Sequence, residues 1–217
     1  MIRRIFCAAL VCLLLTLWAA GSAVPGMAKD EKLLLDCFDR YAQTAHLGVD
    51  KSAYPQFARQ LSAFFRHETE DPSVSAHPFH DYEIIHLFDV RTLMDGISLA
   101  ANLCLMLSAA TAAALAVMYR RQRFSFGRGF VSFLAAAAAV ILYAVLDFNA
   151  VFTLLHRLLF TNELWLLNPN TDLLIALMPE GMFMHLALRI LWRVLPLFAA
   201  FAVLSLLIKK QKRGTDK

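Results

Sequence analysis

Residues 148–179 read FNAVFTLLHRLLFTNELWLLNPNTDLLIALMP, a run in which apolar segments flank a group of polar side chains. The run opens like the outer end of a membrane helix and closes on apolar sequence. Polar groups concentrated at the edge of a membrane predict a functional site. Within seventeen positions this group comprises His156, Arg157, Asn162, Glu163, Trp165, Asn168 and Asp172.

The composition is that of an integral membrane protein. Of the 217 residues, 59% are hydrophobic, and the mean hydropathy is +0.56, which exceeds what the core of a soluble chain of this length requires. Four apolar runs each approach the ~20 residues that a helix needs to cross about 30 Å of hydrocarbon. We therefore expect an all-α membrane protein with four transmembrane helices, at residues 5–24, 97–118, 129–148 and 188–208.

The charges are segregated along the chain, and this predicts the topology. Basic residues gather before the first apolar run, in residues 119–128 and in residues 209–217, whereas sixteen of the seventeen acidic residues lie elsewhere. The positive-inside rule makes these basic clusters cytoplasmic. Both termini are then cytoplasmic, and residues 25–95 and 149–185 are extracytoplasmic parts of a single integral membrane domain, 1–217. Topology and anionic lipid headgroups account for the basic clusters, so no nucleic acid partner is expected.

The N-terminal residues allow two interpretations. Arg3 and Arg4 before an apolar run, with small residues near positions 21–28, resemble a cleaved signal peptide. The apolar run is longer than is usual in such peptides, so an uncleaved first membrane helix is the alternative. Both interpretations place the next segment outside the cytoplasm.

The first extracytoplasmic segment predicts two amphipathic helices. In residues 29–47, Leu34, Phe38 and Tyr41 recur at i, i+4 and i+7, and residues 54–67 repeat the pattern. These helices are too short for an independent domain, and we expect them to cap the membrane bundle.

Histidines and carboxylates gather a second time in residues 77–96, HPFHDYEIIHLFDVRTLMDG. On a helix, Glu83, His86 and Asp89 share one side, and a carboxylate one turn from an imidazole can hold its tautomer. On straight helices His86 and His156 would stand at different heights above the membrane. If the two act together, we expect the chain to bend at Asp95 and Gly96.

Several catalytic classes lack their motifs in this sequence. No GxSxG elbow, HExxH pair, glycine-rich phosphate loop or CxxC pair occurs. Two histidines at the outer membrane edge remain, and imidazole is the natural general base for a lipid ester at this depth. The alternatives are structural histidines in a protein that binds lipid or protein without turnover, and a metal-dependent lipid hydrolase. The metal sets, His77 with His80 and His86, or His86 with His156 and Asp89, have only loose ligand spacing, so no metal or other cofactor is predicted.

Two motifs resemble a known family. HLFDVRTL (86–93) and LLHRLLFTNELWLLNPNTDLLIALMPEGMF (154–183) are similar to the signature of the lipoprotein intramolecular transacylases, a bacterial integral membrane family called Lit. The similarity in layout covers essentially the whole chain, with four crossings and an outer loop before the first motif. The resemblance implies a multi-pass acyltransferase of the bacterial cell membrane whose two essential histidines are His86 and His156, acting outside the cytoplasm.

The resemblance also implies a reaction. Such enzymes move the acyl chain of the sn-2 glycerol ester in a diacylglyceryl-cysteine lipoprotein to the α-amino group of the same cysteine, leaving a lyso-form lipoprotein. The partners would be diacylglyceryl-modified lipoproteins and membrane lipids, with no cofactor. We assign His156 as the base and His86 as the acid or the positioning group, although these roles could be exchanged.

Further residues are expected to orient the histidines or bind substrate. Arg189 and Arg193, four apart near the outer end of the last span, either snorkel or pair with an outer carboxylate or a lipid phosphate. Asp172 belongs to the site or caps the following helix. The remaining assignments are Asp89 as the orienter of His86, Asn149 on nearly the same helix face as His156, and Asn162 with Trp165 as walls of an oxyanion or glyceryl pocket.

Overall fold

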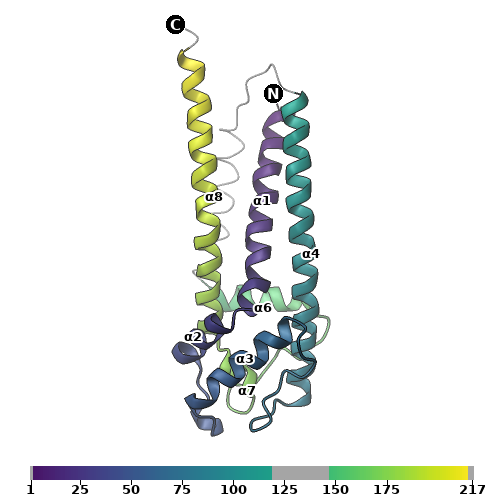
Figure 1. Ribbon diagram of the computed structural model, residues 1–217, viewed down its shortest axis with the longest axis vertical. Helices are drawn as coiled ribbons and strands as arrows, with labels where there is room; N and C mark the ends of the chain where they lie inside the picture. Colours follow the sequence, from purple (N-terminus) through teal and green to yellow (C-terminus); the bar gives the residue numbers. More distant parts are fainter. Residues whose placement is uncertain (1, 119–146, 215–217) are drawn as a thin grey trace. The chain divides into compact units, whose positions relative to one another are not determined.

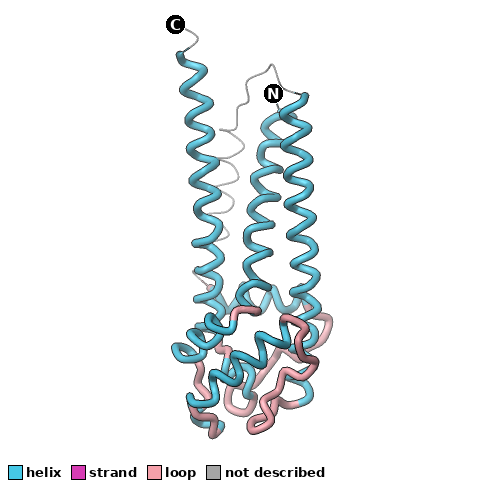
Figure 2. The backbone as a smooth tube through the Cα atoms, viewed as in Figure 1, coloured by secondary structure: helices cyan, strands magenta, loops and turns pink. Residues whose placement is uncertain are grey.

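The computed structural model describes residues 2–118 and 147–214 (Figure 1). These residues contain helices and loops but no strand (Figure 2), which confirms the all-α prediction for this part of the chain. The helices are α1 (Ile2–Ala28), α2 (Glu31–Tyr41), η1 (Ala45–Leu47), η2 (Lys51–Ala53), α3 (Tyr54–Phe65), α4 (Asp81–Met118), α6 (Phe148–Leu159), α7 (Leu173–Leu177) and α8 (Glu180–Gly214).

The chain packs as two compact units. The long-helix unit consists of Met1–Ser22, Leu99–Asp147 and Ile190–Lys217. The short-helix unit consists of Ala23–Ser98 and Phe148–Arg189. Both histidines of interest, His86 and His156, belong to the short-helix unit.

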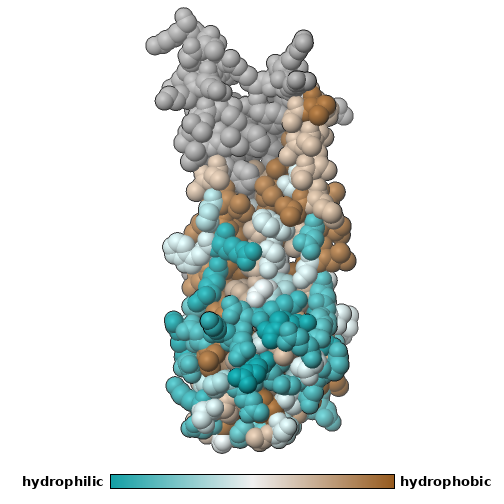
Figure 3. All heavy atoms as spheres, viewed as in Figure 1, coloured by the Kyte–Doolittle hydropathy of each residue, from teal (hydrophilic) through white to brown (hydrophobic). Residues whose placement is uncertain are grey.

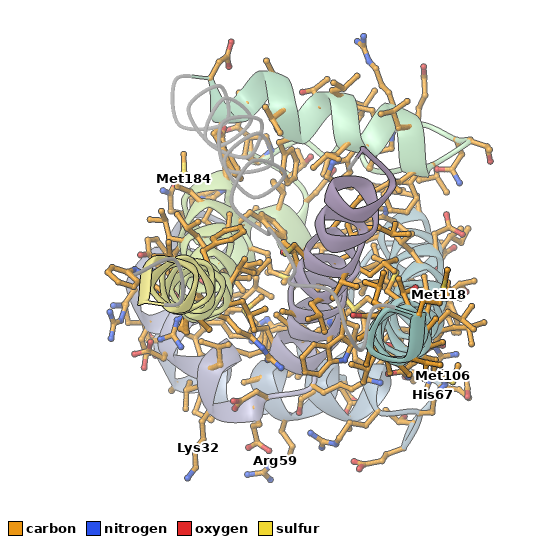
Figure 4. All side chains as sticks on the ribbon, turned by 90° about the horizontal axis from the view of Figure 1, so that it is seen from above. Lys32, Arg59, His67, Met106, Met118 and Met184 are labelled. Atoms are coloured by element: carbon orange, nitrogen blue, oxygen red, sulfur yellow. The ribbon has the colours of Figure 1, made fainter. Side chains whose placement is uncertain are left out.

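The described chain contains helical segments suited to a membrane, and each has part of its length in the long-helix unit. Three segments in the described chain are long and apolar enough to cross one: Leu10–Ala28, Asp81–Met118 and Glu180–Ala200. The face of this unit seen in Figure 3 is largely hydrophobic where it is coloured, and Met106 and Met118 of α4 point outward (Figure 4) with 59% and 69% of their surface exposed. Exposed apolar side chains of this kind are expected on a surface that faces lipid. Within this unit α1 begins and α8 ends at the same end (Figure 1).

The predicted spans can be located on these helices. Residues 5–24, 97–118 and 188–208 fall within α1, α4 and α8. Of the predicted span 129–148, only the last two positions are among the described residues. The predicted cytoplasmic link 119–128 lies wholly outside them.

Helix α4 is longer than a bilayer crossing requires. Its 38 residues extend roughly 57 Å at 1.5 Å per residue, against about 30 Å of hydrocarbon, so residues 81–96 are not needed to cross. The helix continues through Asp95 and Gly96, and the predicted bend there is wrong. A single glycine weakens a helix by only about 1 kcal/mol and does not interrupt it. Within the short-helix unit α6 instead lies crosswise to the first part of α4 (Figure 1), after non-helical Asp147.

The short-helix unit has a hydrophobic core of its own. The predicted amphipathic helices are confirmed as α2 and α3, and their apolar faces supply Phe38, Phe57 and Phe64, each with 0% of its surface exposed. Complete burial of such a side chain contributes about 1.5–3 kcal/mol. Leu87 of α4 and Leu177 of α7 join the same core, and it therefore joins segments from both halves of the sequence.

Polar contacts hold the surface of the short-helix unit. Arg91 of α4, only 9% exposed, lies with its guanidinium 4.3 Å from the ring centre of Phe64. The same guanidinium pairs with Glu70 at 2.6 Å and so fastens the loop after α3 to α4. Lys32 and Arg59 point away from α2 and α3 (Figure 4), in keeping with the hydrophilic surface of this unit in Figure 3.

Candidate active site

His156 lies on α6 with its ring fixed by one hydrogen bond. Its Nδ1 is 2.8 Å from the backbone oxygen of Phe152, one turn earlier. Because a carbonyl oxygen only accepts, Nδ1 must carry the hydrogen, and in the neutral imidazole the free lone pair is then on Nε2. The ring packs among Phe152, Phe160 and Trp165, with centroids 4.1, 5.5 and 5.1 Å away. The three aromatic rings thus fix the orientation of the His156 imidazole, whose Nε2 carries the lone pair.

His86 lies on α4 and is 7% exposed. Its Nδ1 is buried and has no hydrogen-bond partner among the residues that the structure describes. A buried polar atom left without a partner costs about 1–3 kcal/mol, and such atoms are rare enough in proteins to call for an explanation. The ring makes an edge contact with Phe160 at 5.2 Å, so both imidazoles share the same phenyl neighbour.

The structure brings the two histidines side by side. Their ring centroids are 6.4 Å apart. Imidazole atoms lie roughly 1.2 Å from the ring centre, so the nearest atoms of the two rings are at least about 4 Å apart, beyond the ~3.2 Å limit of a direct hydrogen bond. The pair can therefore act on opposite sides of one small reacting group.

Both imidazoles are kept neutral by their surroundings. His86 lies before the predicted span 97–118, and His156 lies after the predicted span 129–148. The pKa of His86 is lowered to about 4, chiefly by burial and also by the nearby His156, while the charge of Asp89 opposes the shift. Burial also lowers the pKa of His156, although its bond to the Phe152 carbonyl favours the charged form. Desolvation disfavours an imidazolium, so at neutral pH both rings are in the form that accepts protons.

Asp89 and Asn162 form a hydrogen bond with each other. The side-chain amide of Asn162 donates to Oδ2 of Asp89 at 2.8 Å, and Nδ1 of His86 has no bond to Asp89 or to any other described residue. The backbone oxygen of Asn162 accepts a bond from Nε1 of Trp165 at 3.1 Å. Asn162 thus joins α4 to the loop that places Trp165 against His156, and the sequence-predicted pair Asn162 and Trp165 lies beside the histidines.

A cavity of about 390 Å³ opens beside this pair. It lies between the first half of α4 and the end of α6 with the residues that follow it. Phe160, the ring that contacts both histidines, forms part of its wall. The lining residues are Asp89, Thr92, Leu93, Gly96, Leu159, Phe160, Thr161 and Asn162.

Glu83 is buried, with 0% of its side chain exposed, and it holds two chain segments together. Its carboxylate accepts from the backbone nitrogen of His80 and from that of Leu174, each at 2.7 Å. The first bond is the reach-back half of a capping box at the start of α4, and the second caps α7. Burial raises the pKa of this carboxyl. The sequence analysis placed Glu83 on the side of His86 and missed this role, which the three-residue spacing from His80 at a helix start could have indicated.

Asp172 occupies the N-cap position of α7, but its carboxylate does not cap that helix. It accepts from the hydroxyl of Tyr82 at 2.7 Å and from the backbone nitrogen of Asn168 at 2.8 Å. The bond to Asp172 raises the pKa of Tyr82 to about 12, so the phenol remains a donor. With Glu83, this contact ties the loop 161–172 to the first turns of α4.

The other predicted residues contact different partners. Asn149 donates to Glu180 at 3.2 Å. Arg189 donates to Nε2 of His185 at 3.0 Å and lies 3.9 Å from Asp36, the pairing with an outer carboxylate that was one of its alternatives. In the long-helix unit, Arg193 donates to Ser22 at 3.4 Å. These contacts involve neither His86 nor His156.

No group of three histidine, cysteine, aspartate or glutamate side chains lies close enough to hold a metal ion in the described ranges 2–118 and 147–214. All members of the metal sets proposed from the sequence fall within these ranges. Those sets are therefore not assembled.

The family model of lipoprotein intramolecular transacylase Lit matches residues 9–183. The chain belongs to the Lit family. It is therefore an acyltransferase of a membrane-integral family that modifies lipoproteins, and the resemblance drawn from the two motifs is confirmed. The match spans α4, α6 and the loop after α6, and so includes both histidines.

Solved structures of Lit share this fold. The membrane-integral Lit from Bacillus cereus superimposes with a TM-score of 0.76 at 20% identity, covering 97% of this chain and 98% of that chain. Two variants of the same protein, in which one histidine is replaced by arginine or by alanine, each give a TM-score of 0.72 at 19% identity. These cover 98% and 97% of this chain and 95% and 96% of theirs. No curated protein matched the sequence.

Proposed function

We propose that this Lit family member moves the sn-2 acyl chain of a diacylglyceryl-cysteine lipoprotein to the α-amino group of the same cysteine, using His86 and His156 as general acid and base. The observation that carries the proposal is that the ring centroids of the two imidazoles are 6.4 Å apart, one ring having a fixed tautomer and the other a buried nitrogen with no partner among the described residues.

The nucleophile defines the first task of the site. An α-amino group has a pKa of about 7.7–8.0, so only about a tenth to a sixth of it is neutral at pH 7. The ammonium form has no lone pair and cannot attack an ester. Its extra proton must leave before attack, and a base is needed again when the new C–N bond makes the nitrogen positive.

His156 is the base in this proposal. Its Nδ1 is occupied by the Phe152 carbonyl, so its Nε2 presents the lone pair. The aromatic rings around it fix its direction, and a fixed direction is what a proton acceptor requires. Its lowered pKa keeps it unprotonated at neutral pH.

His86 faces the same reacting group from α4 as the acid or the positioning group. Its Nδ1 has no partner among the described residues, and a substrate oxygen would supply one. The hydrogen bond so gained is expected to offset the cost of burying that nitrogen. A proton on Nδ1 could then be donated to the oxygen that leaves.

The proposed reaction balances without a cofactor. The neutral amine attacks the ester carbonyl, a C–N bond forms, and the bond between the carbonyl carbon and the sn-2 oxygen breaks. One proton leaves the nitrogen for the histidine pair, and one proton passes from the pair to the sn-2 oxygen. The products are an amide and a free hydroxyl within one molecule, so neither water nor a nucleotide is consumed. Because amine and ester are already linked, the enzyme supplies geometry and excludes water.

Mass spectrometry of a cellular lipoprotein tests this function. The chain is expressed in a host that lacks N-acylation, and we expect conversion of the diacylglyceryl-cysteine to an isobaric product whose acyl group is on nitrogen. His156→Ala should lower the rate by about 10²–10⁴-fold, the usual contribution of a general base, and His86→Ala should also lower it strongly.

A third histidine provides the matched control. His67 is exposed, pairs with Asp95 at 3.0 Å and has a left-handed backbone with φ 62°, which asparagine tolerates. His67→Asn is expected to retain activity. Unchanged lipoprotein in the wild type, or full conversion in both alanine variants, would refute the proposal; binding without conversion would identify a lipid-binding protein instead.

A further inference from the structure

The cavity next to the histidines carries a negative charge that no cation in the described residues neutralises. Asp89 is half-buried at its wall, and its Oδ2 accepts from Asn162. No ion pair involving Asp89 is found among the described residues. A carboxylate beside a cavity is expected to attract a cationic ligand.

The cavity is also suited to the headgroup end of a lipid. Leu93, Leu159 and Phe160 give it apolar walls, whereas Thr92 and Asn162 offer hydrogen-bonding groups near the carboxylate. Few polar groups in a mainly apolar cavity fix the orientation of a small ligand.

The cavity and the histidines share one side chain. Phe160 lines the cavity and contacts His86 at 5.2 Å and His156 at 5.5 Å. A group bound at Asp89 would therefore lie close to the reacting centre.

We propose that this cavity binds the protonated α-amino end of the lipidated cysteine, with Asp89 as the counter-ion of the ammonium and Asn162 holding the carboxylate in place. The proposal rests on the proposed transacylase function. It explains why Asp89 turns to Asn162 rather than to Nδ1 of His86. It also gives a specificity rule: an N-terminal cysteine that is already acylated on nitrogen lacks the charge and is not retained, so the product leaves.

Gly96 supplies an independent way to test the cavity. A Cβ built at Gly96 meets nothing within 4 Å, and its backbone is helical. Alanine is therefore accommodated without strain, whereas leucine at this position would occupy space in the cavity. The two substitutions differ in how much of the cavity they fill, and both favour the helix over glycine.

Binding of two unreactive probes separates this inference from turnover. Both are S-(2,3-dialkylglyceryl)-cysteinyl peptides with ether links in place of esters; one has a free α-amino group and the other is N-acetylated. Dissociation constants are measured on the purified full-length protein in nanodiscs. We expect the wild type to bind the free-amine probe about tenfold more tightly or better, as charge-assisted hydrogen bonds are the strong ones. Asp89→Asn should remove that preference, while the asparagine oxygen can still accept from Asn162.

Asp95→Asn is the matched control, because Asp95 is on the same helix but does not line the cavity. It should keep the preference for the free amine. Gly96→Leu should raise the dissociation constants of both probes about tenfold or more, and Gly96→Ala should leave both unchanged.

Each result supports or overturns the inference. Equal affinity of the two probes in the wild type, or a preference that survives Asp89→Asn, would overturn it even if ester-linked substrate is converted normally. A reduced rate in Asp89→Asn with unchanged probe affinities would identify Asp89 as an orienter of His86 and also overturn it. An amine preference that depends on Asp89, in a protein that converts no ester-linked substrate, would support this site and refute the transacylase function.

Discussion

At the residue scale, the two imidazoles make a definite prediction about pH. Burial lowers the pKa of His86 from its usual 6.5 to about 4 and lowers that of His156 as well. A general base works in its neutral form, so lowering its pKa preserves activity at pH values where an ordinary histidine would be protonated. We expect kcat/KM, measured from pH 4.5 to 9 with ester-linked substrate, to fall on the acid side only below pH 6.5 after correction for the protonation of the substrate amine. An acid limb at or above pH 6.5 would contradict the buried, neutral pair.

The sequence predicted the two histidines of the site but not the partner of Asp89. His86 and His156 could be proposed because each lies in a polar group next to apolar sequence, and the structure places them side by side. The orientation of Asp89 could not, because helix periodicity puts Asp89 and His86 on one side but does not show that Asn162, seventy-three positions away, offers the better donor. Long-range hydrogen bonds between loops and helices leave no periodic signal.

At the element scale, the loop 161–172 is positioned by its bonds to α4. The Tyr82 hydroxyl donates to Asp172 at 2.7 Å, and this loop carries Asn162 and Trp165. Tyr82→Phe removes the hydroxyl, but Oδ1 of Asp172 still accepts from the Thr171 hydroxyl at 2.7 Å, so the expected cost is that of one lost hydrogen bond, about 1 kcal/mol. We expect faster amide hydrogen exchange in residues 161–172 and a several-fold lower kcat, with α2 and α3 protected as before. Tyr41→Phe, outside this loop, is the control; equal exchange in both variants would show that the bond does not position the loop.

The elements themselves were predictable where periodicity is strong. The apolar stripes of α2 and α3 were recognised because three-to-four-residue spacing identifies one helix face. The path of the chain into α6 was not, since a run of apolar residues does not show that Asp147 is non-helical and that a new helix begins at Phe148. The expected bend in α4 followed from assuming a straight continuation into α6, and the crosswise α6 makes that bend unnecessary.

At the scale of the whole molecule, the segregation of charge predicts that the short-helix unit faces away from the cytoplasm. This orientation is a proposal that single-cysteine labelling tests. Lys32 is exposed on α2 (Figure 4), so Lys32→Cys should react with a membrane-impermeant maleimide in intact cells. Lys212→Cys, in the C-terminal basic cluster, should react only after permeabilisation. The unsubstituted chain is the control, since it reports any labelling of the four native cysteines, of which Cys37 has 0% of its surface exposed.

The labelling result decides where the chemistry can occur. Lys32 and His156 belong to the same compact unit, so a label at position 32 reports the side on which the histidines act. Lipoprotein acyl chains and the amino group of the lipidated cysteine would have to be available on that side. Labelling of Lys32→Cys only after permeabilisation would place the histidines on the cytoplasmic side, and the proposed extracytoplasmic reaction would then be wrong even if both alanine variants were inactive.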